Sequence, residues 1–360
     1  MDTITQIALG AAVGEVVLGR KVGNKALLWG AIGGTIPDLD VLATPFASDV
    51  NMLVIHRGFT HSVFFSLLFA PLFGWLIAKL YRKKPEASWR EWGWLMYWAL
   101  LTHPLLDMFT IYGTQFLNPF SDELFGTGAI FIIDPLYTLP LLAGLILILR
   151  LQRNNPQRFK IVATLLAIST SYLLLASTLR IKAQSNFETA LQQQNIPYSQ
   201  IMTTASPLNT IMWMGAAANE DSVWIGNYSF LDSDKDITFH RVPKNTDLIA
   251  KNLNDLPVKR LLWFSHGFYT VRKENDELIL SDLRFGRSDA WTSTEGQYVF
   301  QFFLDRAEDG SNEIVDFHRP EPSFNNIGES FSKLYRRVKG DKSFVEYTGL
   351  KQEQIPDAAK

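Results

Sequence analysis

The chain has 360 residues, with 34 basic side chains, 36 acidic side chains and no cysteine. Without cysteine there can be no disulfide or thiolate metal site, so a metal ion would have to be held by histidine, carboxylate or backbone oxygen. The formal net charge of -2 lacks the basic excess of a dedicated nucleic-acid-binding protein, and no nucleic-acid partner is expected.

Charged residues divide the chain into two parts of different character. Of the first 184 residues 26 are charged, whereas 44 of the last 176 are charged. About a quarter is the usual share in a soluble domain. We therefore predict an α-helical integral membrane domain over residues 1–182, followed by a β-rich soluble domain over residues 183–360.

The predicted membrane domain contains two short apolar runs and four long ones. The short runs are rich in glycine, and the spacing of Gly10 from Gly14 and of Gly30 from Gly34 would let two helices pack closely. The long runs approach the roughly 20 residues that a spanning helix needs. In chain order the six runs are Ile4–Gly19, Ala26–Pro37, Ser62–Leu80, Trp92–Ile111, Ala129–Leu149 and Ile161–Leu179.

Basic residues predict the orientation of these helices. They cluster in the connections at residues 20–25, 79–90 and 150–160, which the positive-inside rule places in the cytoplasm. The intervening loops at residues 38–61 and 112–128 contain one basic residue, Arg57. This pattern predicts a multi-pass membrane protein whose C-terminal domain is extracytoplasmic. The two short runs form either two crossings or a re-entrant hairpin, and the other four keep their orientation in both cases.

Unusual polar residues gather at the predicted outer ends of the helices. His103 and Asp107 lie one helical turn apart, so both side chains leave the same face of a helix. Imidazole and carboxylate together suit zinc, manganese or iron(II). We predict a divalent-metal site, most simply a zinc site, whose ligands are Asp38, His56, His61, His103 and Asp107.

Two neighbouring residues are predicted to be catalytic. An unligated Asp40 would accept a proton from water, and Arg57 would bind an anionic group, because a guanidinium pairs well with phosphate or carboxylate. Other interpretations remain open. The two aspartates can form a turn or orient the histidines, Arg57 can form a salt bridge with Asp38 or Asp40, and a single buried histidine is often a packing residue.

Three motifs, in this order, resemble a known family. They are Pro-Asp-Leu-Asp at residues 37–40, His-Arg-Gly-Phe-Thr-His-Ser at residues 56–62 and Thr-His-Pro-Leu-Leu-Asp at residues 102–107. The first 180 residues or so resemble the YdjM-type membrane-bound metal-dependent hydrolases of bacteria. The resemblance implies a bacterial inner-membrane location and hydrolysis. It also implies that the metal-site positions are Asp38, Asp40, His56, His61, His103 and Asp107.

Two further points come from the same comparison of motifs. A more distant similarity to zinc-dependent phospholipase C and P1-type nucleases implies a phosphoester substrate. Family members often have Thr-His near the N-terminus, where this chain has Thr5-Gln6. Because glutamine is a poorer metal ligand than histidine, this departure puts a second metal position in question.

The second half contains segments rich in β-branched and aromatic residues, bounded by Gly, Asn, Asp and Pro, a pattern typical of strands and hairpins. They follow a short amphipathic stretch at Ala183–Gln194. Its histidines, His240, His266 and His318, have no partner at a ligand-like interval. The predicted strands are Thr210–Met214, Ser222–Phe230, Leu261–Val271, Glu277–Leu283 and Tyr298–Leu304.

Together these patterns predict a metal-dependent hydrolase acting on a phosphoester, including a lipid or lipid-linked one, at the outer face of the membrane. Membrane lipid and the phosphoester are the expected partners. Two other classes remain open. One is a non-catalytic anchor whose metal staples the helices while the β-rich domain binds a partner. The other is a divalent-metal transporter, although transport sites tend to lie at the membrane midplane.

Overall fold

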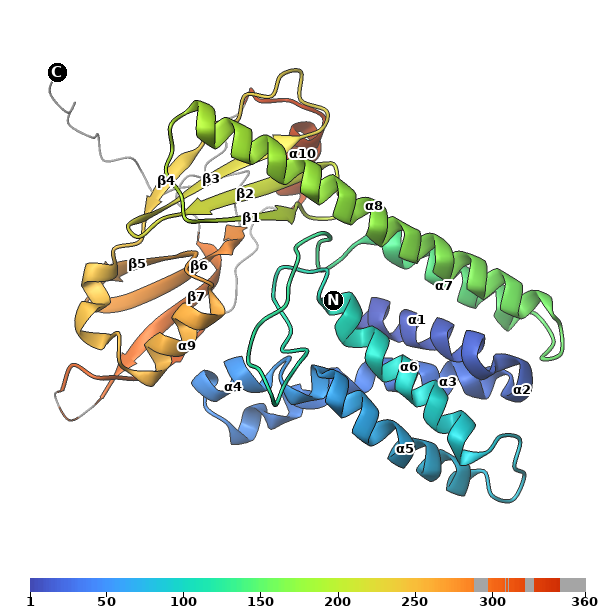
Figure 1. The fold of residues 1–360 in the computed structure, drawn as a ribbon. Coiled ribbons are helices and arrows are strands. Elements are labelled where there is room, and N and C mark those ends of the chain that lie inside the picture. Colours follow the sequence, from blue (N-terminus) through green and yellow to red (C-terminus); the bar gives the residue numbers. More distant parts are fainter. Residues whose placement is uncertain (288–296, 308, 310, 321–326, 344–360) are drawn as a thin grey trace, which may run out of the picture. The chain divides into compact units, whose positions relative to one another are not determined.

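The computed structural model describes residues 1–287, 297–307, 309, 311–320 and 327–343. It divides into two compact units. The first is helical and comprises Met1–Ala47, Val54–Leu179 and Ala205–Thr210. The second comprises Ser48–Leu53, Arg180–Thr204 and the described residues from Ile211 onward, and it is built around two β-sheets (Figure 1).

Helices account for most of the chain up to residue 193. Short irregular helices interrupt the α-helices at the places where the predicted site residues lie. In order they are α1 (Thr3–Gly14), the π-helical η1 (Glu15–Gly19), α2 (Arg20–Val22), α3 (Asn24–Thr35), the 3-10 helix η2 (Ile36–Phe46), α4 (Asp49–Ile55), the 3-10 helix η3 (Phe59–His61), α5 (Val63–Leu80), α6 (Trp89–Asp107), α7 (Pro135–Leu149) and α8 (Gln157–Gln193).

Three of these stretches are long and apolar enough to cross a membrane, namely Asn24–Phe46, Val63–Leu80 and Gln157–Gln193. Helix α7 is apolar but shorter. It begins at Pro135 rather than Ala129, because the Asp134 side chain caps it by accepting hydrogen bonds from the backbone N–H groups of Leu136 and Tyr137. The apolar run had suggested that Asp134 lies within the helix. It is instead the residue that caps the start of the helix.

Helix α6 has a different role from the other long helices. It was expected to continue to Ile111 but ends at Asp107. Trp92, Leu95 and Leu100 on this helix are fully buried. The helix packs against α1, α3 and α5 (Figure 1). It is therefore surrounded largely by protein, which is the setting that polar side chains at membrane depth require.

The glycine pattern of the two short runs does produce close helix packing, as predicted. A Cβ atom on Gly10 would collide with the carbonyl oxygen of Gly30, and one on Gly30 would collide with the carbonyl oxygen of Gly10. Gly34 is equally close to the backbone of Gln6, and Gly33 lies against Ala99 of α6. These contacts hold α1, α3 and α6 together and fix where α3 ends, three residues before Asp38.

A second set of contacts holds the opposite end of α1. Arg158 was expected in a cytoplasmic loop, but its guanidinium is buried and forms two hydrogen bonds with Glu15, at 2.9 and 3.0 Å. It also donates to Asn24 and to the carbonyl oxygens of Ile148 and Leu151. A buried charge pair is tolerated when its hydrogen bonds are satisfied in this way. Arg158 thus joins η1, α3, α7 and α8.

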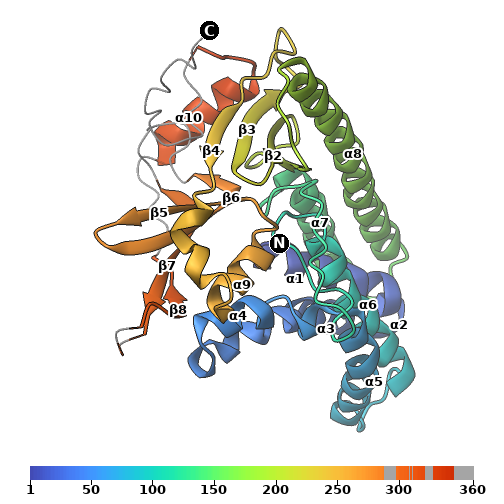
Figure 2. The ribbon, with the colours of Figure 1, turned by 60° about the vertical axis from the view of Figure 1, so that its left-hand side comes forward.

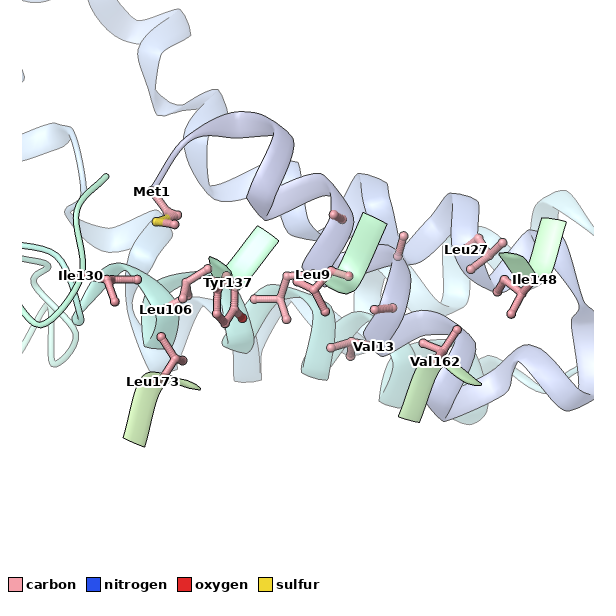
Figure 3. Packing of buried hydrophobic residues seen from close by; sticks show 14 of the residues in the cluster. Met1, Leu9, Val13, Leu27, Leu106, Ile130, Tyr137, Ile148, Val162 and Leu173 are labelled. Carbon is pink, nitrogen blue, oxygen red and sulfur yellow. The ribbon is translucent and has the colours of Figure 1, made fainter. Parts of the chain in front are cut away.

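The apolar core of the first unit lies between α1, α6, α7 and α8. Figure 3 shows Leu9 and Val13 of α1 beside Leu106 of α6, Tyr137 of α7 and Leu173 of α8. All five side chains are buried. The outward surfaces of α5, α7 and α8 carry exposed leucine and isoleucine side chains, as expected for helices that face lipid.

Helix α8 has 37 residues, a length of about 55 Å at 1.5 Å per residue. A bilayer core is about 30 Å thick, so the helix extends well beyond one. The amphipathic stretch Ala183–Gln194 is therefore the continuation of this helix rather than a separate element. Its Phe187 packs on Gly215 of a strand in the second unit, and this part of α8 lies along one sheet (Figures 1 and 2).

The second unit contains two four-stranded antiparallel sheets, each with its strands in sequence order. The predicted strand at Leu261–Val271 is wrong in its first part. Val258, Leu261 and Phe264 are buried at helical spacing behind Pro257, so a helix forms there. The elements are β1 (Gln200–Ala205), β2 (Met212–Ala218), β3 (Ser222–Ser229), β4 (His240–Pro243), η4 (Thr246–Asn252), α9 (Leu256–Phe264), β5 (Tyr269–Glu274), β6 (Glu277–Arg287), β7 (Tyr298–Arg306), β8 (Ile314–His318) and α10 (Ile327–Val338).

We expect Gly30→Ala to lower the free energy of unfolding by about 1–3 kcal/mol, because the added methyl group would force α1 away from α3. Gly328→Ala is the control, since a Cβ atom there would meet no atom within 4 Å. Thermal unfolding of the full chain in detergent measures the effect. Equal melting temperatures for the two variants would contradict this account of the packing.

Candidate metal centre

Three of the predicted ligands converge from three different elements. Asp38 lies at the start of η2, His61 ends η3, and His103 lies on α6. The Nε2 atoms of the two histidines are 3.2 Å apart. Oδ1 of Asp38 lies 3.3 Å from Nε2 of His61 and 3.4 Å from Nε2 of His103. Asp38, His61 and His103, which we call the triad, could together hold a metal ion.

The distances between Oδ1 of Asp38 and the Nε2 atoms of His61 and His103 fit one small divalent ion. Ligand bonds of 2.0–2.1 Å around tetrahedral zinc place neighbouring donor atoms about 3.3–3.4 Å apart. The three separations in the triad agree with that value to within 0.2 Å. Two imidazoles and a carboxylate are also a donor set that zinc, manganese and iron accept.

The hydrogen bonds behind the triad prepare both histidines to act as ligands. Nδ1 of His103 lies 2.6 Å from the carbonyl oxygen of Gly34. A carbonyl oxygen only accepts, so Nδ1 must donate, and the tautomer that this bond selects carries its lone pair on Nε2, which points to the triad. Nδ1 of His61 lies 3.1 Å from Oγ1 of Thr60 and 3.5 Å from Oδ2 of Asp40.

Burial also favours the form of His61 that binds metal. This side chain has no exposed surface. Desolvation lowers the pKa of His61 to about 4, in spite of the opposing effect of Asp38. The imidazole is therefore neutral at pH 7, and its nitrogen lone pair is available.

Asp107 lies one turn after His103 and approaches the triad from another side. Its Oδ2 atom is 3.7 Å from Nε2 of His61 and 3.8 Å from Nε2 of His103. That oxygen is buried and has no hydrogen-bond donor among the described residues. The Arg57 guanidinium, whose Nε atom lies 3.3 Å away, balances the charge of this oxygen, and its position beside the two Nε2 atoms also places it within reach of an ion held by the triad. Asp107 is a fourth candidate ligand.

The other oxygen of Asp107 is held by groups that the sequence did not reveal. Its Oδ1 atom accepts hydrogen bonds from Nε2 of Gln6 at 2.9 Å and from the α-amino group of Met1 at 2.5 Å. Gln6 also donates to the carbonyl oxygen of His103 at 3.3 Å. At the position where the motif comparison anticipated a histidine ligand, Gln6 therefore supports a carboxylate through its amide N–H.

The structure does not bring His56 into the triad. Nδ1 of His56 lies 3.0 Å from Oδ1 of Asp40, and about a third of its side chain is exposed. The chain turns sharply between His56 and His61, because Arg57 adopts a left-handed backbone conformation with a φ of 59°. Asp40 itself is buried, and its Oδ2 accepts hydrogen bonds from the backbone N–H of Arg57 and from Thr60.

Arg57 lies beside Asp107 rather than beside Asp38 or Asp40. Its Nε atom is 3.3 Å from Oδ2 of Asp107, and one Nη atom donates to Oγ1 of Thr110 at 3.3 Å. The guanidinium carbon lies 4.6 Å from the centre of the Tyr112 ring. Burial and these contacts fix a positive charge next to the triad. Thr110 and Tyr112 follow α6 directly, and no sequence signal had marked them.

Comparison with known proteins finds a family that covers the part of the chain with the triad. Residues 1–182, which include the triad, match the family described as YdjM inner membrane protein. The chain belongs to the YdjM family of inner membrane proteins. The expected resemblance to the YdjM family is thereby confirmed, and the description of the family as an inner membrane protein agrees with the long apolar helices of the first unit.

Two curated relatives are similar over part of the YdjM-family chain. The uncharacterized protein YfhP of Bacillus subtilis (strain 168) is 31% identical over 153 residues, which are 40% of this chain and 45% of YfhP. The inner membrane protein YbcI of Escherichia coli (strain K12) is 35% identical over 130 residues, 34% of this chain and 69% of YbcI. The chain thus spans less than half the length of YfhP. No solved structure matches.

We expect Asp40→Asn to weaken metal binding by about 10–100-fold, the usual effect of losing a carboxylate that orients a ligating histidine. The exposed Asp122 provides the control variant Asp122→Asn. Competition with a chromogenic chelator on the full chain measures both affinities. If Asp40→Asn bound zinc as tightly as Asp122→Asn, Asp40 would have no role in holding His61.

Proposed function

We propose that this YdjM-family protein is a membrane-bound metal-dependent hydrolase that cleaves a phosphoester. The observation that carries the proposal is the triad, where one carboxylate oxygen and two imidazole lone pairs meet at 3.2–3.4 Å. Asp38, His61 and His103 would hold the metal, with Asp107 as the fourth candidate. A divalent ion bound there supplies Lewis acidity toward water and a phosphoryl oxygen.

Arg57 supports a phosphoester rather than an uncharged ester as substrate. Among the described residues, Nη1 of Arg57 donates to Thr110, no hydrogen bond from Nη2 is found, and the buried Nε atom lies 3.3 Å from Oδ2 of Asp107 without a hydrogen bond. The side chain is held in place by Asp107, Thr110 and Tyr112 before any substrate arrives. A fixed guanidinium is well suited to bind phosphate oxygens and to stabilise charge that develops on them. We assign Arg57 to that role.

Asp40 and His56 together support proton transfer. The sequence alone suggested Asp40 as the acceptor, but its oxygens are already used by His56, Thr60 and the backbone of Arg57. We propose that Asp40 orients His56. Nε2 of His56 has no hydrogen bond to any described residue. It would take the proton that water loses as its oxygen bonds to phosphorus, and would return it to the alcohol oxygen whose bond to phosphorus breaks.

Within this proposal the protein crosses the membrane several times and carries the second unit on the extracytoplasmic side. The support is the distribution of basic residues, which leaves Arg57 as the one basic residue in the predicted outer loops. The triad and Asp107 then lie toward the outer side, where the loop residues 108–133 meet the ends of α5 and α6.

The topology can be tested with single cysteines, because the natural chain has none. Ser233 of the second unit and Lys83 of the α5–α6 connection are both exposed. In intact spheroplasts we expect a membrane-impermeant maleimide to label Ser233→Cys and not Lys83→Cys, and detergent should expose both. Labelling of Lys83→Cys alone in intact cells would reverse the proposed orientation.

The hydrolase proposal predicts a bound metal that depends on the triad. We expect the purified full chain to contain about one zinc, manganese or iron ion, and His61→Gln and His103→Gln to lose it. Both variants should reduce the hydrolysis of bis-p-nitrophenyl phosphate to the background rate, because the metal supplies the Lewis acid. His318→Gln is the matched control, since His318 is an exposed histidine of the second unit.

Metal content by mass spectrometry and hydrolysis, measured on the same preparations, separate the possible functions. Metal that persists in both triad variants would contradict the assignment of the ligands. A wild-type chain that binds metal, melts at a lower temperature without it and hydrolyses no phosphoester would favour the metal-stapled anchor. Uptake of metal into proteoliposomes would favour a transporter.

A further inference from the structure

The 3-10 helix η2 has an apolar surface directly beside the triad. Four of its large apolar side chains are exposed, namely Leu39, Val41, Leu42 and Phe46, which we call the η2 face. Phe46 is 90% exposed and Leu42 66% exposed. In contrast, Asp40 of the same helix is buried. The helix therefore turns its carboxylates toward the site and its large apolar side chains outward.

Membrane lipid is the surrounding that fits the η2 face. Helix η2 continues α3 without a break, and the joined stretch Asn24–Phe46 is apolar and long enough to cross a membrane. Between Ala26 and Phe46 the only charged residues are Asp38 and Asp40. Four large apolar side chains exposed within eight residues form a surface that water would disfavour and acyl chains would cover.

The triad residue that is partly exposed belongs to this same helix. His61 and His103 have no exposed side-chain surface, whereas 26% of the Asp38 side chain is exposed. Asp38 immediately precedes Leu39, and a 3-10 helix rises only about 2 Å per residue. Leu39 and Leu42 are thus within about 8 Å of Asp38 along the helix. The exposed part of the triad therefore lies within two turns of the η2 face.

Phe59 of η3 adds an apolar side chain close to His61 in the sequence. Phe59 precedes His61 by two residues and is partly exposed. The Phe59 ring also makes edge-on contacts with the rings of Phe65 and Phe69 of α5. The two triad residues that come from irregular helices, Asp38 and His61, therefore each have an exposed apolar neighbour.

We propose that the substrate is a lipid phosphoester whose acyl chains lie on the η2 face while its phosphate reaches the triad past Asp38. This inference rests on the proposed hydrolase function and narrows its substrate class. The lipid approaches from within the membrane. The apolar side chains bind its chains, and Arg57 and the triad bind the phosphate.

Lipid contact at the η2 face can be tested without any turnover. The chain without cysteine allows single nitroxide labels at Leu42→Cys and Phe46→Cys in the full protein, in vesicles of palmitoyl-oleoyl phosphatidylcholine and phosphatidylglycerol. Leu174→Cys on α8, an exposed position of an apolar stretch, is the lipid control. The exposed Asp122→Cys is the water control. We expect both η2 labels to show a higher collision rate with oxygen than with a water-soluble nickel complex, as the label at Leu174 should.

Hydrolysis tests the substrate class on the same protein. We expect palmitoyl-oleoyl phosphatidylglycerol to be cleaved with a kcat/KM at least tenfold above that of its deacylated form, glycerophosphoglycerol. Leu42→Asn should lower the rate with the lipid and leave the rate with bis-p-nitrophenyl phosphate unchanged. Labels at Leu42 and Phe46 that behave like the label at Asp122, or equal cleavage of the lipid and its deacylated form, would overturn the inference.

The two proposals can fail separately. A chain that cleaves bis-p-nitrophenyl phosphate with its metal, but prefers no lipid, would keep the hydrolase and remove the lipid substrate. A chain that binds no metal and cleaves neither kind of phosphoester would remove the hydrolase and, with it, the lipid substrate. In that case lipid contact at the η2 labels would report only how η2 is embedded.

Discussion

The hydrogen bond between Nδ1 of His103 and the carbonyl oxygen of Gly34 is the contact on which the candidate site depends. It fixes the imidazole so that Nε2 presents its lone pair, and it ties α6 to the end of α3 only four residues before Asp38. It can form because α3 packs so closely on its neighbours. Gly34 lies against the backbone of α1, and Gly33 lies against Ala99 of α6. A bulkier residue at these places would move both Asp38 and His103.

Polar groups inside a membrane have to be surrounded by protein that satisfies their hydrogen bonds. The first unit contains such buried polar groups at both ends of α1. At one end Gln6 and the α-amino group of Met1 hold Asp107. At the other end Arg158 holds Glu15 and three further acceptors on neighbouring elements. The two clusters differ in one respect. Charges are paired in both clusters, since Asp107 also lies beside Arg57, but next to Asp107 the triad directs three metal-ligating atoms at a common space.

Part of the helix packing and of the candidate site could be predicted from the sequence, because the residue patterns that indicate them are local. Glycines four apart predicted the contact of α1 with α3, and the spacing of His103 and Asp107 placed both on one face of a helix. His56 could not be placed, because its position depends on the left-handed conformation of Arg57, which turns the chain between the two histidines. Gln6, Thr110 and Tyr112 reach the site only through tertiary contacts. Helix α9 was missed because the continuous apolar run Leu261–Phe264 also suits a short buried strand.

The central claim is that Asp38, His61 and His103 hold one metal ion, and X-ray absorption at the metal edge tests it most directly. For the zinc-loaded full chain we predict two imidazole nitrogens and oxygen ligands at about 2.0–2.1 Å, and His61→Gln should leave at most one imidazole. A spectrum with three imidazoles would bring His56 into the site. A spectrum of zinc with water ligands alone would mean that the triad is a polar packing contact and not a metal centre.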